Sequence, residues 1–181
     1  MRNDGADTAD PSFETLMAEV MTSSQRFGHR QHVQLTWLAV RNCGTPKAVS
    51  LVSEGIQRTA RYAGAPQKYH ATVSRAWVEL VGFHVDEHPD ADFDTFVKLN
   101  SALLDKRLLT RFYRPATLAA QRARQGWVEP DLAPFPWQRL ASRDPRAELW
   151  RWRPSSRNLF YRTGLQGAAR FRRRLGRYRR R

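Results

Sequence analysis

The segment "GTPKAVSLVSEGIQRTARYAG", Gly44–Gly64, holds the start, the body and the end of one helix. Thr45 and Pro46 form an N-cap residue followed by proline at the first helical position, which is typical of a helix start. The apolar residues that follow fall on one stripe at helical spacing: Val49, Val52, Ile56 and Ala60. A glycine bounds the segment at either side, as at helix ends. The segment therefore predicts an amphipathic helix between the two glycines.

The flanking sequence continues the helical pattern. Residues 28–42 and 69–88 carry apolar positions at helical spacing, and Gly44 and Pro89 stand where these helices would end. Shorter helices are expected in 91–100, 101–113 and 114–126, the last with Thr117 at or near its cap. No long stretch alternates apolar and polar residues with the period of a strand. We therefore expect an all-α fold, a compact bundle of five or six helices joined by short loops.

Beyond Gly126 the sequence changes character. The segment "WVEPDLAPFPWQRL" contains three prolines, which exclude one regular helix, and four large apolar residues: Trp127, Leu132, Phe135 and Trp137. These side chains are too apolar for a free linker, so the segment predicts an extended strap over the bundle. The predicted organisation is a mobile leader in residues 1–25, with room for a short turn of helix in "FETLMAEVM", a helical domain with its strap in 26–138, and an arginine-rich tail in 139–181.

Charge is distributed unevenly along the chain. Residues 139–181 hold fifteen arginines, no lysine and two acids, whereas residues 1–138 hold 16 basic and 15 acidic residues. The tail therefore carries a net charge of +13 and the remainder only +1. The single cysteine, Cys43, excludes an internal disulfide and a cysteine-rich zinc site. With no secretory signal and no apolar run of about 20 residues, we expect a cytoplasmic protein without a transmembrane segment.

Three histidines are candidates for a shared polar site. His29 and His32 stand one helical turn apart in "FGHRQHV", and His70 stands at the start of another expected helix in "KYHATV". If those helix starts meet, the three imidazoles could bind zinc or iron, or act in proton transfer with the phenol of Tyr69 as a second catalytic group. The alternative is structural, because a partly buried histidine usually finds a hydrogen-bond partner and has no further role.

Four ordered motifs in residues 26–137, "FGHRQHVQLTWL", "YHATVSRAW", "SALLDKRLL" and "YRPATL…WVEPDLAPFP", resemble a family of small bacterial helical proteins of unassigned function. That family's pattern is similar to FxHxxH, then YHET, LLD and a closing PDLxPxP. The resemblance implies that His29, His32 and His70 belong to one site. Two positions depart from the pattern: Gln31 and Ala71 stand where the family often has glutamate. If those carboxylates act as ligands or bases, this chain is an altered or inactive member.

The arginine-rich tail suggests a different function. Its last twelve residues, "RFRRRLGRYRRR", combine cations that neutralise phosphates with aromatic rings that stack on bases. The candidate nucleic-acid contacts are Arg172, Arg173, Arg174, Arg177 and Tyr178. No sequence-reading motif accompanies them. An anionic membrane surface and a merely solvated tail are the alternatives, since the whole chain prefers arginine, with 27 Arg to 4 Lys.

Three functions follow from these features. The first is a small protein with a histidine-lined site for an unknown small molecule, with or without a metal. The second is a non-catalytic protein that binds nucleic acid through its tail. The third is a helical interaction protein without chemistry.

Overall fold

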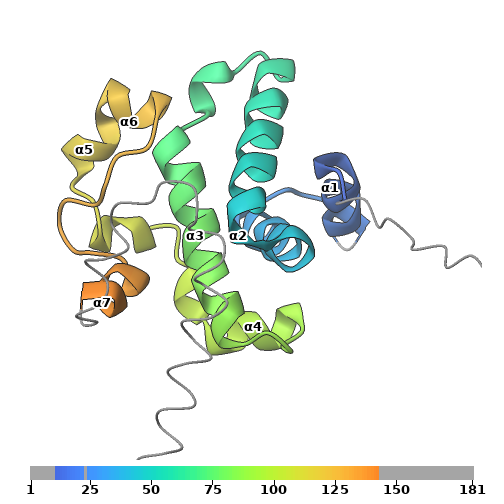
Figure 1. Ribbon diagram of the computed structural model, residues 1–181. Coiled ribbons are helices and arrows are strands. Elements are labelled where there is room, and N and C mark those ends of the chain that lie inside the picture. Colours follow the sequence, from blue (N-terminus) through green and yellow to red (C-terminus); the bar gives the residue numbers. More distant parts are fainter. Residues whose placement is uncertain (1–10, 23, 143–181) are drawn as a thin grey trace, which may run out of the picture. The chain divides into compact units, whose positions relative to one another are not determined.

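Helices make up most of the described chain. The computed structural model describes residues 11–22 and 24–142, and this part contains α-helices and 3-10 helices but no strand (Figure 1). The α-helices are α1 (Phe13–Thr22), α2 (His29–Tyr62), α3 (Ala71–Glu87), α4 (Phe93–Leu99), α5 (Pro115–Ala119), α6 (Gln121–Gln125) and α7 (Pro136–Ser142). The 3-10 helices are η1 (Pro66–Lys68), η2 (Ser101–Leu104) and η3 (Leu108–Arg111). The all-α prediction is confirmed. The chain divides into two units between Gln138 and Arg139, and α1 to α6 belong to the first.

Helix α2 is bent at Gly44, as Figure 1 shows. The glycine has φ 76° and ψ 159°, outside the helical region, so the helix consists of two halves with different directions. Glycine alone adopts this conformation at low cost because it has no Cβ. The predicted stop at Gly44 and restart at Thr45 and Pro46 are therefore confirmed.

Two glycines let the helices approach closely. A Cβ on Gly82 of α3 would lie 2.2 Å from Oγ1 of Thr45 in α2. A Cβ on Gly55 of α2 would lie 2.1 Å from Cδ2 of Phe13 in α1. Both distances are far below van der Waals contact, so these positions require glycine if the neighbouring side chains stay in place.

The helical turn predicted in "FETLMAEVM" is present as α1, but this helix is packed and not part of a mobile leader. This helix packs against α2 and buries its apolar stripe: Phe13, Leu16 and Val20. Burial of each large apolar side chain stabilises the packing of α1 by about 1.5–3 kcal/mol. Residues 1–10 lie outside the described part of the chain.

The expected helices in 101–113 and 114–126 are each divided. Residues 101–113 contain η2 and η3 instead of one α-helix. Residues 114–126 contain α5 and α6, separated by Ala120, whose backbone is extended (φ −65°, ψ 141°). Thr117 is not a cap: Pro115 begins α5, and the Thr117 hydroxyl donates a hydrogen bond to Asp131 over 2.6 Å.

The segment after Gly126 crosses the bundle as predicted, although its end differs. Tyr113 donates a hydrogen bond to the carbonyl of Val128 (2.8 Å), and Val128 N–H donates to Thr72 Oγ1 (3.1 Å). The Phe135 ring is fully buried and stacks on Trp137 with ring centroids 4.5 Å apart. Leu132 is exposed, and Pro136 begins α7 instead of extending the strap. Three of the four predicted apolar contacts therefore lie against the domain.

Candidate functional site

His70 caps the start of α3. Its Nδ1 accepts a hydrogen bond from the backbone N–H of Val73 over 3.2 Å, and its Nε2 lies 2.8 Å from the carbonyl oxygen of Leu118. Because Nδ1 accepts, the ring proton is on Nε2, which donates to Leu118. Both ring nitrogens are thus occupied by backbone groups, and the imidazole joins α3 to α5.

His29 also bonds to a distant backbone carbonyl. Its Nε2 lies 2.9 Å from the oxygen of Leu103 in η2, and its ring packs edge-on against Trp77 with centroids 4.7 Å apart. Burial lowers the pKa of His29 below its usual value, so the neutral form, with Nε2 as donor, is favoured. The residue therefore fixes the start of α2 against η2 and α3.

His32 is packed as an apolar ring. Its ring lies edge-on to the Phe27 ring with centroids 4.4 Å apart, and the ring nitrogens make no hydrogen bond to the described residues. Burial, with a smaller contribution from His29, lowers the pKa of His32 to about 4. Near neutral pH this imidazole is uncharged.

The three histidines do not assemble a metal centre among the described residues, where no group of three or more His, Cys, Asp or Glu is placed to hold an ion. Zinc or iron binding by His29, His32 and His70 stays a prediction. A metal on His70 requires one of its two backbone bonds to break, whereas Nδ1 of His29 makes no hydrogen bond to the described residues. Gln31 has a structural role, because its Oε1 accepts from the N–H of Gly28 over 3.0 Å. Ala71 is the first residue of α3.

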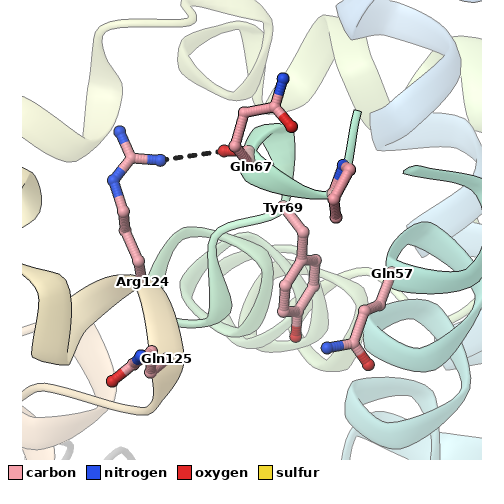
Figure 2. Close-up of a pocket in the computed structure, with 6 residues that line it drawn as sticks. Gln57, Gln67, Tyr69, Arg124 and Gln125 are labelled. Carbon is pink, nitrogen blue, oxygen red and sulfur yellow. Dashed lines mark hydrogen bonds between the residues drawn. The ribbon is translucent and has the colours of Figure 1, made fainter. Parts of the chain in front are cut away.

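Tyr69, the second predicted catalytic residue, lines a pocket between α2, η1 and α6 (Figure 2). The pocket has a volume of about 510 Å³. Its lining contains three amides but no carboxylate: Gln57, Pro66, Gln67, Tyr69, Arg124 and Gln125. In Figure 2 the Tyr69 ring and the Gln57 amide lie on one side, and Arg124 with Gln125 on the other.

Backbone contacts fix the positions of the pocket residues. Tyr69 ends η1, with its N–H donating to Pro66 over 3.1 Å, and it directly precedes the capping residue His70. Arg124 donates from Nη1 to the carbonyl of Gln67 over 3.1 Å, which joins α6 to η1. The other N–H groups of this exposed guanidinium make no hydrogen bond to the described residues, so they can bind a ligand.

The pocket lies between two segments that lack acidic residues. Residues 55–78 contain four Lys or Arg and residues 106–128 contain six, and neither contains Asp or Glu. The rest of residues 1–138 holds 6 basic and 15 acidic residues. The two acid-free segments, which supply all the lining residues of the pocket, together carry a charge of +10, and the rest of residues 1–138 carries −9.

Some of these cations have partners and others do not. Arg58 pairs with Glu14 across 2.6 Å, and Arg75 pairs with Glu79 across 2.7 Å. Three exposed cations of these segments form no ion pair with the described residues: Arg61, Lys68 and Arg122. Positive potential around the pocket is thus only partly compensated.

The sequence predicted Tyr69 but missed Gln57, Gln67, Arg124 and Gln125. Glutamine has no spacing pattern, and Arg124 lies 57 positions from the Gln67 carbonyl that it contacts. The signal in the sequence that could have pointed to these residues was the pair of acid-free segments, 55–78 and 106–128.

The tail residues Arg172, Arg173, Arg174, Arg177 and Tyr178 lie outside the described residues. No helix within residues 11–22 and 24–142 has both the length and the apolar character to cross a membrane. Comparison of the chain with family models, curated proteins and solved structures gives no match.

Proposed function

We propose that this chain is a non-catalytic protein that binds nucleic acid, with the arginine-rich tail supplying the phosphate contacts. The observation that carries the proposal is the separation of charge within the folded body. Two acid-free segments, which together carry a net charge of +10, both line one pocket, while the rest of residues 1–138 carries −9. The body and the +13 tail therefore both offer positive charge to a polyanion.

A general preference for arginine does not account for this pattern. Such a preference would replace lysine by arginine throughout the chain, but it would leave the acids where they are. Here 23 residues, 106–128, and 24 residues, 55–78, contain no acid although the body has 15. The contacts between the segments, such as Arg124 with Gln67, bring the two acid-free runs together. Binding of an anion explains why acids are excluded from both.

The histidine environments support a binding role over a catalytic one. A general base needs a free nitrogen within reach of substrate, whereas the nitrogens of His70 are both bonded to backbone groups. Burial lowers the pKa of His32 to about 4, so its imidazole is a weak base near neutral pH. The single cysteine fits the reducing cytoplasm, where we place the protein as part of this proposal.

Fluorescence anisotropy with a labelled single-stranded 20-mer RNA tests the function in the full-length chain. The variant changes Arg172, Arg173, Arg174 and Arg177 to Gln together. Its matched control changes Arg143, Arg146, Arg151 and Arg153 to Gln, an equal loss of charge in the same tail. Binding is measured at several salt concentrations, because each lost phosphate contact reduces the salt dependence.

The terminal variant is expected to bind at least tenfold more weakly at low salt. Four lost contacts lower the slope of log K against log salt by about 3 for a single strand. The control variant is expected to lose less. Equal affinity and equal slope for wild type and the terminal variant contradict the proposal, as does preferential binding to vesicles of anionic lipid over RNA.

A further inference from the structure

We propose that the pocket between α2, η1 and α6 holds one nucleotide, with its base stacked on Tyr69 and its phosphate at Arg124. This inference rests on the proposed function and names the part of the folded domain that contacts the nucleic acid. The pocket volume of about 510 Å³ lies within the range of roughly 300–1,000 Å³ that is usual for ligand sites. The lining residues determine which ligand fits.

The amides suit the edge of a base. Gln57, Gln67 and Gln125 each carry a donor and an acceptor on one planar group. Bases present adjacent donors and acceptors on their edges, and a glutamine amide can bind adenine through two hydrogen bonds. Acidic side chains, which would repel a phosphate, are absent from the lining.

Tyr69 supplies a face for stacking. Its side chain is half-buried and lines the pocket, and its backbone is held by the bond to Pro66 and by the neighbouring cap residue His70. A ring that is positioned before binding loses little entropy when a base stacks on it. Stacking on an aromatic ring is a sequence-tolerant contact for single-stranded nucleic acid.

Arg124 supplies the charge. One Nη1–H is bonded to the Gln67 carbonyl, which orients the guanidinium, and the other donors are free to contact phosphate oxygens. Arg61 follows Gln57 by four residues on α2, so it stands one turn away on the same side of the helix. Glu54 is the nearest acid to Gln57 on α2 and precedes it by three residues.

Binding of full-length variants to a labelled single-stranded 12-mer tests the site. Tyr69→Leu removes the ring, and Tyr69→Phe keeps it. Arg124→Gln removes the charge. The matched controls are Tyr62→Leu, since Tyr62 is 86% exposed and does not line the pocket, and Arg26→Gln, since Arg26 is an exposed arginine outside both acid-free segments. Circular dichroism and thermal melting identify any variant that fails to fold.

Tyr69→Leu is expected to weaken binding by about 5- to 100-fold, the measured range for one stacked base. Arg124→Gln is expected to weaken it by about tenfold and to lower the salt slope by about 0.7. Tyr69→Phe and both controls are expected to stay within about twofold to threefold of wild type. If folded Tyr69→Leu and Arg124→Gln bind no more weakly than Tyr62→Leu and Arg26→Gln, the inference is wrong.

A second arm separates this inference from the proposed function and tests the source of the nucleotide. Adenosine monophosphate is titrated into ¹⁵N-labelled protein, and amide shifts are followed around Tyr69 and Arg124. RNA binding that depends on the tail but not on the pocket rejects the pocket and keeps the function. Monophosphate binding that Tyr69→Leu removes, without any RNA binding, rejects the function and assigns the pocket to a free nucleotide. Absence of both rejects both.

Discussion

His70 donates a hydrogen bond to the carbonyl oxygen of Leu118 over 2.8 Å, and this bond joins the start of α3 to α5 across 48 positions of sequence. The same imidazole accepts from Val73 through its other nitrogen. The residue that the sequence marks as a catalytic group or metal ligand is therefore a connector between helices. It also fixes the backbone directly after Tyr69, at the border of the pocket.

Removal of the His70 side chain is expected to destabilise the fold. His70→Ala loses the cap of α3 and leaves the Leu118 carbonyl without its donor, which together cost about 2 kcal/mol in the free energy of unfolding. His70→Asn keeps a capping side chain and loses only the bond to Leu118, so it is expected to cost about 1 kcal/mol. Urea denaturation of the three proteins at pH 7 measures both differences.

Metal analysis of the same proteins is the control for that prediction. Elemental analysis of untagged wild type and His70→Ala, purified without chelator, is expected to give equal zinc and iron contents. Near-stoichiometric zinc or iron in wild type that disappears in His70→Ala would restore the metal hypothesis for His29, His32 and His70. It would also show that the backbone bonds of His70 give way to a ligand.

The low pKa of His32 predicts a loss of stability at acidic pH. The pKa is about 4 in the fold, against 6.5 for the unperturbed group, so the unfolded chain binds more protons between these values. Stability is therefore complete above pH 6.5 and falls as the pH decreases toward 4. The slope is up to about 1.4 kcal/mol per pH unit for one such group, and His29 acts in the same direction.

His32→Leu tests that assignment, because leucine keeps an apolar side chain against Phe27 and does not titrate. The free energy of unfolding of wild type is expected to decrease between pH 7 and pH 5 by more than that of His32→Leu. Parallel pH profiles for the two proteins would show that His32 is protonated as readily in the fold as in the unfolded chain.

Gly55→Ala is expected to disturb the contact between α1 and α2. The added Cβ would meet the Phe13 ring at 2.1 Å, and overpacking of this kind costs about 1–3 kcal/mol. Gly126→Ala is the control, because a Cβ there has only Arg122 O within 4 Å, at 3.8 Å. Thermal melting of both variants compares the two sites.

A double-mutant cycle with Phe13→Ala identifies the cause. Once the ring is absent, Gly55→Ala no longer meets an obstacle and gains the higher helix propensity of alanine. The effect of Gly55→Ala is therefore expected to be near zero or stabilising in the Phe13→Ala background. An unchanged cost in that background would place the conflict elsewhere.

Local signals in the sequence predicted the long helices and their ends. The glycine at 44 followed by Thr45 and Pro46 marks the bend of α2, and Asp92 caps α4 by accepting from Thr95 N–H over 2.7 Å. These signals act within a few residues, so they can be read without the fold. The division of 101–125 into short turns was missed because Ala120 and Asp105 carry no breaker signal strong enough to predict it.

The candidate site depends on contacts that are distant in sequence. His29 meets Leu103 over 74 positions, and Arg124 meets Gln67 over 57. Spacing along one helix cannot tell whether a histidine nitrogen faces a carbonyl or a metal, because the deciding atom comes from another element. The absence of acidic residues from 55–78 and 106–128 can be seen in the sequence. That the two segments contact each other, and so combine their positive charge, is known only from the structure.

The most direct test of the central claim is ultraviolet crosslinking of the full-length chain to single-stranded RNA that contains 4-thiouridine, followed by trypsin digestion and mass spectrometry. Cleavage after Lys68 and Arg75 releases Tyr69–Arg75 as one peptide, which can be recognised by its mass. Crosslinks are expected on this peptide and on the tail, and Tyr69→Leu is expected to remove the first set alone. No crosslink at saturating RNA would contradict nucleic-acid binding by this protein, and crosslinks confined to the acid-rich remainder of residues 1–138 would contradict binding through the pocket and the tail.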